Sequence, residues 1–270
     1  MSTRAVSVAG TGGTTARATT QIGSDIILPS GGPWIISSIW GMTARNTAIP
    51  DQGSGGELIV VAASGDIEPN PAPGKFPLIG TPASSSANTT ISANPLNLYP
   101  VNWLAAGRAT ISLWYRNQLA MTTGDNVRAG LIFGDEIPEK RPILFSDTVQ
   151  ASFASATEQT VGSITLAEKA TRITGIMAVL NKGDAITIAE PIIGAIRLSS
   201  SDLLLPPSQY PFNCCFDSAD GTLAGSTSIP RSEYIPVDIP VNGGAIIDVY
   251  ATTDVSVTGN ADVSVYLAYE

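Results

Sequence analysis

The stretch GSDIILPSGGPWIISSIWG, residues 23–41, decides the fold of this chain. It holds a short apolar run, a turn rich in proline and glycine, and a second apolar run. Residues 161–178, VGSITLAEKATRITGIMA, repeat the same order of apolar and polar positions. The second stretch could form a helix by its composition, but Pro29 and Pro33 exclude a helix interior in the first. Both stretches are therefore predicted to form a strand, a turn and a strand.

Six further runs alternate apolar and polar residues with the period of a β-strand. They are rich in β-branched and aromatic residues, and turn residues bound them. The sequence therefore predicts an all-β fold. The runs are residues 56–64, 108–117, 127–135, 194–202, 244–259 and 261–270.

The two halves of the chain align with each other at offsets of 136 to 138 residues. Such steady offsets indicate a tandem duplication, although any two all-β sequences can be made to match at some apolar positions. The aligned pairs are Ile27 with Ile164, Ile36 with Ile173, Ile39 with Ile176, Gly56 with Gly194, Leu58 with Ile196, Val60 with Leu198, Pro100 with Pro236, Gly107 with Gly243, Ala109 with Ala245, Ile111 with Ile247, Val127 with Val263 and Leu131 with Leu267.

A repeat of this length predicts a complete domain in each copy, because solenoid units are far shorter. We expect an N-terminal arm at residues 1–19, a first sandwich at 20–137, a linker at 138–152 and a second sandwich at 153–270. Two long irregular pieces, residues 65–95 and 203–233, stand at matching places in the copies. They are predicted to be loops, or a partly helical insertion, that cross one end of each sandwich.

Composition and charge limit the partners of the chain. Of its 270 residues, 43% are apolar and only 14% are charged. Residues 1–130 carry seven Lys/Arg against six Asp/Glu, and residues 131–270 carry seven against seventeen, so the halves have net charges of +1 and −10. There is no basic run, and direct nucleic acid binding is therefore not expected. No apolar segment has the length of a membrane span and no secretion signal opens the chain, which predicts synthesis in a cytoplasm.

Two consecutive sandwiches with a long excursion in each resemble the double jelly-roll major capsid proteins of tailless icosahedral viruses. This lineage includes the adenovirus hexon and the coat proteins of tectiviruses and corticoviruses, and the small corticovirus coat protein is the most similar in length. The opening pattern from Ile27 to Ile39 resembles the first two strands of such a barrel. The closing run from Gly243 to Tyr269 resembles the last two. The resemblance covers residues 20–270 and implies two tandem eight-stranded antiparallel jelly-roll β-sandwiches.

The same resemblance implies a function by self-assembly. In that family three chains form a pseudo-hexagonal capsomer, so a homotrimer within a capsid lattice is expected here, with an outer rim built from residues 65–95 and 203–233. The resemblance also implies a place in the virion of a bacteriophage, after synthesis in the host cytoplasm. Minor capsid or vertex proteins and an internal membrane are its implied partners.

The residue types predict no catalytic, cofactor or metal site. The chain has no histidine, which excludes the usual triads and zinc sites. The adjacent Cys214 and Cys215 are expected to be reduced thiols packed under a loop, because neighbouring carboxylates raise a thiol pKa. Carboxylates gather in two groups that we expect to be solvated loop charges, with an ion site at an interface as the alternative. These are Asp135, Glu136 and Glu139, and Asp217 and Asp220.

Two other functions remain open at this stage. The four tryptophans, Trp34, Trp40, Trp103 and Trp114, all lie in the first copy and are expected to pack in the core and at the interface between the domains. The second copy has Arg172, Met177, Ile239 and Tyr250 at the matching positions. An exposed aromatic platform would instead indicate a tandem β-sandwich that binds carbohydrate or acts as an adhesin or spike. Two carboxylates facing each other across a cleft would indicate a glycoside hydrolase.

Overall fold

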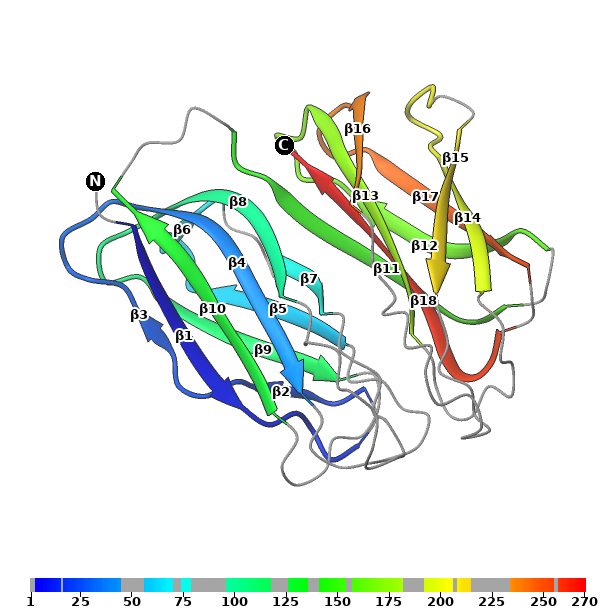
Figure 1. Ribbon diagram of the computed structural model, residues 1–270. Coiled ribbons are helices and arrows are strands. Elements are labelled where there is room, and N and C mark those ends of the chain that lie inside the picture. The colour runs from blue at the N-terminus through cyan, green and yellow to red at the C-terminus, as the bar shows by residue number, and fades with distance from the viewer. Residues whose placement is uncertain are drawn as a thin grey trace. The chain divides into compact units, whose positions relative to one another are not determined.

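The computed structural model describes residues 3–15, 17–44, 56–69, 74–78, 96–117, 126–135, 141–153, 157–181, 192–205, 208–214, 234–254 and 257–270. Every element in these ranges is a β-strand (Figure 1). The chain divides into two compact units, and the described residues up to Leu144 belong to unit 1 and those from Phe145 onward to unit 2. Within the described ranges no helix is long and apolar enough to cross a membrane.

Unit 2 consists of two four-stranded antiparallel sheets. Their strand orders are β11-β18-β13-β16 and β12-β17-β14-β15. Counted along the unit, the first sheet holds the first, eighth, third and sixth strands and the second holds the second, seventh, fourth and fifth. This order is that of a jelly roll. The strands are β11 (Leu144–Phe153), β12 (Gln159–Thr165), β13 (Arg172–Asn181), β14 (Ile192–Ser199), β15 (Gln209–Cys214), β16 (Ile235–Pro240), β17 (Ile246–Thr253) and β18 (Val257–Tyr269).

Unit 1 repeats this order with two additions. Its sheets run β1-β10-β4-β8-β6 and β2-β9-β5-β7, and β3 also pairs with β9. The second strand of the jelly roll is thus divided into β2 and β3, and β6 extends one sheet. The strands are β1 (Arg4–Gly10), β2 (Thr19–Gln21), β3 (Ile26–Ile27), β4 (Trp34–Ala44), β5 (Gly56–Ala62), β6 (Ile67–Glu68), β7 (Gly74–Leu78), β8 (Asn97–Ala105), β9 (Thr110–Asn117) and β10 (Asn126–Gly134).

The expected fold class, two tandem jelly-roll sandwiches, is confirmed by these strand orders. Two expected boundaries are wrong. The arm expected at residues 1–19 contains β1, which pairs with β10 over its whole length and is the first strand of unit 1. The linker expected at 138–152 contains most of β11, the first strand of unit 2. The strand β1 was not predicted from the sequence because its side chains are small and glycines lie near it. The strand β11 was not predicted because prolines and charged residues flank it.

Each unit has its own core, made by the alternate side chains that its two sheets turn inward. In β9 every second residue is buried, from Ile111 to Asn117, and β17 follows the same pattern. Ile111 in unit 1 and Ile247 in unit 2 are both fully buried. Full burial of one such aliphatic side chain contributes about 1.5–3 kcal/mol, so a core of many such side chains is what stabilises each sandwich.

Strand register confirms the internal repeat position by position. Ile36 pairs with Trp103 and Phe133, and at an offset of 137 Ile173 pairs with Ile239 and Tyr269. We call residues that hold the same register position in the two units twins. The twins Gly56 and Gly194, Leu58 and Ile196, and Val60 and Leu198 follow an offset of 138, and Ile111 and Ile247 follow an offset of 136, as the sequence predicts.

A β-bulge lies at the same place in both units. The register shifts between Ile36 and Ser38 in β4 and between Ile173 and Gly175 in β13, which leaves Ser37 and Thr174 as the extra residues. The Ser37 hydroxyl donates a hydrogen bond to the Ile132 carbonyl at 3.1 Å. The Thr174 hydroxyl donates to the Ala268 carbonyl, the twin of the first, at 3.2 Å. A hydroxyl thus holds the bulge in each copy.

The chain also reverses in the same way before β9 and before β17. The Ala109 amide bonds to the Ala106 carbonyl and the Ala245 amide to the Asn242 carbonyl, both at 3.2 Å. A carboxylate then accepts from the first amide of the following strand in each unit. Asp66 accepts from the Thr110 amide at 2.9 Å, and Asp202 accepts from the Ile246 amide at 3.3 Å.

Two pairs of twins have interchanged serine and aspartate. In unit 1 the hydroxyl of Ser112 on β9 donates to Asp25 at 2.7 Å. In unit 2 Asp248 on β17 is the acceptor and Ser163 on β12 is the donor, at 2.6 Å. Equivalent positions in the two units therefore form a serine–aspartate hydrogen bond, but the serine of one unit stands where the other unit has the aspartate.

Two alignments made from the sequence are off by one residue. Ile26 is opposite Ile111 and Ile164 is opposite Ile247, so the twin of Ile164 is Ile26 and not Ile27. The side chain of Ile27 is exposed, and a comparison of sequence alone cannot choose between two consecutive isoleucines. The sequence alignment also matched Trp34 of the first copy with Arg172 of the second. By strand register, the twin of Arg172 is Ile35.

Candidate functional site

The described part of the chain does not bring the candidate reactive residues together. Cys214 ends β15, where its partner across the ladder is Ile192. Asp135 follows β10, and Cys215, Glu136, Glu139, Asp217 and Asp220 lie outside the described residues. In the ranges that are described, no group of three or more His, Cys, Asp and Glu side chains could hold a metal ion.

The four tryptophans do not form one surface. Trp34 and Trp103 are buried, at 6% and 0% exposure, and each indole N–H donates to a backbone carbonyl, of Pro29 and of Ile143 respectively, at 2.9 Å. Trp40 lies over Gly130 on the sheet that contains β4, whereas Trp114 belongs to the other sheet of the sandwich. The expected core role therefore holds for two of the four, and the other two are partly exposed on different sheets.

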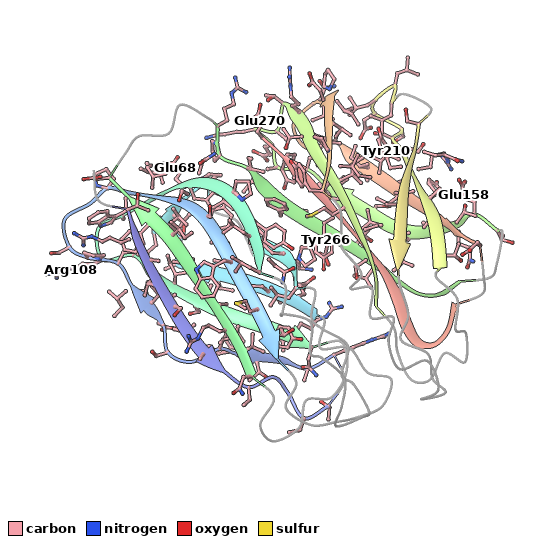
Figure 2. The ribbon with its side chains drawn as sticks, viewed as in Figure 1. Glu68, Arg108, Glu158, Tyr210, Tyr266 and Glu270 are labelled. Atoms are coloured by element: carbon pink, nitrogen blue, oxygen red, sulfur yellow. The ribbon has the colours of Figure 1, made fainter. Side chains whose placement is uncertain are left out.

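An ion pair crosses the outer face of the β12-β17-β14-β15 sheet in unit 2. The Arg197 guanidinium on β14 binds both carboxylate oxygens of Glu158, at 2.6 and 2.9 Å, and stacks on the Tyr250 ring at 4.1 Å from its centroid. Figure 2 labels Glu158 beside this sheet. The hydrogen bond from Arg197 lowers the pKa of Glu158, and the Glu158 carboxylate raises the pKa of Arg197. The cluster links β14 and β17 to the residue before β12.

Unit 1 buries a phenol and a carboxylate. Burial raises the pKa of Tyr99, so the phenol stays protonated and donates its hydrogen to the Pro77 carbonyl. Glu57 on β5 is 3% exposed and lies 3.9 Å from the guanidinium of Arg116 on β9. Tyr99 links β8 to β7 in the other sheet, and Glu57 lies beside Arg116 of the neighbouring strand.

The two long irregular pieces contain sheet strands. Residues 65–95 include β6 and β7, and residues 203–233 include β15, so the expectation of loops is wrong at these positions. The remaining parts of both pieces, 70–73, 79–95, 206–207 and 215–233, lie outside the described residues. The outer rim predicted from them therefore stays a prediction.

Exposed apolar side chains are the main surface feature that sequence analysis missed. Leu98 and Leu104 project from the outer face of β8, at 49% and 40% exposure, although alternation would place polar residues there. The signal was present in the sequence NLYPVNWLA, where both alternate sets contain apolar residues. The other large exposed apolar side chains are Ile27, Val61, Leu96, Leu204, Tyr234 and Ile246. Single exposed apolar side chains are normal on protein surfaces, so these residues alone do not identify an interface.

No family model matches the sequence, and no curated protein matches it. Among solved structures, PNGF-II is similar at 9% identity with a TM-score of 0.49 over 98% of this chain, which spans 65% of the length of PNGF-II. The Sulfolobus turreted icosahedral virus structure is similar at 11% identity and a TM-score of 0.49, over 99% of this chain and 90% of that one. Infectious bursal virus derived T=1 particles are similar at 11% identity and a TM-score of 0.23, over 100% of this chain and 73% of that one. All three TM-scores are below 0.5, so the fold assignment rests on the strand orders of this chain itself.

Proposed function

We propose that this chain is the major coat subunit of a tailless icosahedral virus and acts by self-assembly and not by catalysis. The observation that carries the proposal is the presence of two jelly rolls in one chain with the same strand order, the same bulge and the same turn. It agrees with the resemblance of the sequence to double jelly-roll coat proteins. Fold alone does not fix function, so assembly is the property to test.

The proposed assembly is a homotrimer. Each chain contributes two similar sandwiches, so a trimer places six of them around its threefold axis. The outline of such a trimer is approximately sixfold symmetric. Exposed apolar residues such as Leu98 and Leu104 supply surface that association would cover. The protein would be made in the host cytoplasm and reside in the virion. Vertex proteins and an internal membrane are further partners that the resemblance implies.

The test is the mass and outline of the purified protein. Light scattering should give three times the mass of the chain, and negative-stain images should show compact particles with a hexagonal outline. A monomer that persists at high concentration would contradict the coat function and favour a binding module. In that case a glycan array would test carbohydrate binding directly, and a panel of polysaccharides would test hydrolysis.

A further inference from the structure

Sheet edges differ in how they are protected against pairing with another chain. An exposed edge strand offers unpaired backbone groups, and proteins block such edges with short strands, proline, bulges or charges. The four sheets described in this chain have eight edges. Seven of them carry one of these features: β2 and β6 are short, β7, β15 and β16 contain proline, β12 has a bulge at Val161, and β11 contains Asp147.

The edge strand β1 has none of these features. It is seven residues long, RAVSVAG, and pairs with β10 without a register shift. It contains no proline and no acidic residue, and its one charged residue, Arg4, stands at its end. Ser7 and the two alanines on the same face of the strand, Ala5 and Ala9, are exposed. Among the described sheet edges, β1 is therefore the one that carries no feature against strand addition.

The backbone groups that face outward can be identified from the pairing with β10. The Val6 carbonyl lies against Gly130 of β10, because a Cβ added at Gly130 would overlap it. In an antiparallel ladder the groups of alternate residues point to opposite sides of the strand. The N–H and C=O groups of Ala5, Ser7 and Ala9 therefore point away from β10, toward the open edge.

The sequence of this edge is a palindrome. Ala5-Val6-Ser7-Val8-Ala9 reads the same in both directions. Two copies that meet antiparallel about Ser7 place serine opposite serine, alanine opposite alanine and valine opposite valine. Arg4 is then opposite Gly10 of the other copy, so like charges do not face each other. This is the self-complementarity that a two-fold interface between identical chains requires.

We infer that β1 is a two-fold contact, at which the edge strands of two copies of this chain pair antiparallel about Ser7. The outward groups of Ser7 form two hydrogen bonds with those of the other Ser7, and Ala5 pairs with Ala9 on either side. Val6 and Val8 are half-buried in one copy and gain cover from the valines of the other. Among the described residues, Gly23 comes close to Ala9, because a Cβ added at Gly23 would lie 3.1 Å from the Ala9 carbonyl oxygen; glycine carries no such atom.

This contact is separate from the trimer of the proposed function. A two-fold axis joins two chains, so it would link one capsomer to the next or, without capsomers, make a simple dimer. Loss of the two-fold contact with trimers intact would therefore leave the proposed function standing. Trimers that never form would overturn the coat function without affecting the edge pairing.

The first test is a cross-link at the axis. Opposed residues in a hydrogen-bonded antiparallel pair have Cα atoms about 5.5 Å apart, within the range of a disulfide. Ser7→Cys should therefore oxidise to a covalent dimer at least about tenfold faster than Ala5→Cys, whose thiol has no thiol opposite it. A mixture of Ala5→Cys and Ala9→Cys should cross-link faster than either alone. Wild type, which retains Cys214 and Cys215, gives the background. Equal rates for Ser7→Cys and Ala5→Cys would overturn the inference.

The second test removes the outward hydrogen bonds. Ser7→Pro deletes an amide that points away from β10, so the sandwich should fold, because proline is tolerated on an open edge. Two intermolecular hydrogen bonds are lost, which should raise the dissociation constant of the two-fold contact at least about tenfold. Ser7→Ala keeps the amide and should associate as wild type does. Circular dichroism checks folding, and sedimentation measures association. Unchanged association of a folded Ser7→Pro protein would contradict the pairing.

Discussion

The two jelly rolls share a backbone plan and differ in surface chemistry. On one outer face of unit 1, Ile59 of β5 is opposite Trp114 of β9. Their twins in unit 2 are Arg197 and Tyr250, which form a stacked cation pair that Glu158 completes. The bulge and the turn are kept in both units while these side chains have changed. What a jelly roll has to conserve is thus the geometry that sets strand register, and its exposed side chains are free to diverge.

The sharpest comparison is between the two cores. Ile111 and Ile247 are twins, both fully buried, and each faces another buried isoleucine. Ile111→Ala and Ile247→Ala should each lower the free energy of unfolding of their own unit by about 2–5 kcal/mol, through lost burial and the cavity left behind. All four tryptophans lie in unit 1, so tryptophan fluorescence follows that unit and circular dichroism follows both. An equal shift of the fluorescence transition by Ile247→Ala would show that the cores do not unfold separately.

The turns before β9 and β17 should differ in how well they tolerate replacement of their glycine by alanine. A Cβ at Gly243 would overlap the Glu168 carbonyl, whereas a Cβ at Gly107 would meet the Ser30 carbonyl at 2.8 Å. Because a backbone atom cannot move aside cheaply, Gly243→Ala should cost about 3 kcal/mol and Gly107→Ala about 1 kcal/mol. Urea unfolding monitored by circular dichroism and by fluorescence measures the two losses. A larger loss at Gly107 would show that the two turns are packed differently from the structure.

Removing the hydroxyl at the shared bulge should reduce stability by a smaller amount, and by a similar amount in the two units. Ser37→Ala and Thr174→Val each delete the hydroxyl that donates to a backbone carbonyl across the strand. Each should destabilise its unit by about 1 kcal/mol, the net contribution of one such hydrogen bond. The measurement is urea unfolding, with Ser38→Ala, next to the bulge, as the matched control. Loss in only one of the two units would mean that the bulge no longer needs its hydroxyl in the other.

Sequence analysis predicted the repeat well because the repeat is carried by buried alternate positions. The offsets at Gly56, Pro100 and Ile111 agree with the observed register. It failed at β1, where alanine, serine and glycine give little apolar contrast, although the valines alternate correctly. It also could not show which of Ile26 and Ile27 points inward, since a shift of one residue turns a strand over.

Surface properties were harder to predict. The stacked Arg197 and the exposed leucines of β8 depend on which strands are neighbours, and strand order in a jelly roll joins segments far apart in the chain. The interchange of serine and aspartate between the two units could not be seen in the sequence for the same reason. Each residue alone is an ordinary polar residue, and only the pair identifies the conserved contact.

The equivalence of the two arrangements can be tested by introducing the residues of unit 2 at the twin positions of unit 1. Ser112→Asp places a second carboxylate opposite Asp25 and should cost unit 1 about 0.5–1 kcal/mol, because like charges directly opposite on neighbouring strands repel. Adding Asp25→Ser recreates the arrangement of unit 2 and should recover most of the loss. The coupling energy from this double-mutant cycle, measured by fluorescence-detected unfolding, checks the expectation. A double variant that is no more stable than Ser112→Asp would show that the twin contacts are not interchangeable.

The smallest expected effect is the loss at low pH of the stability that the Glu158–Arg197 ion pair gives to unit 2. Arg197 lowers the pKa of Glu158 below its usual value of 4.5, so the pair stabilises the folded state above that pH and loses this contribution as pH falls through the lowered pKa. Both side chains are about one-third exposed or more, and solvent limits the contribution to about 0.2–1 kcal/mol. Glu158→Gln should therefore be less stable than wild type at pH 7 and equal to it at pH 2, while Arg197 stays stacked on Tyr250 in both proteins. Fluorescence of unit 1, where Ile59 and Trp114 replace the charged cluster, should not change with this substitution at either pH. A difference that persists undiminished at pH 2 would assign the stabilisation to packing instead of charge.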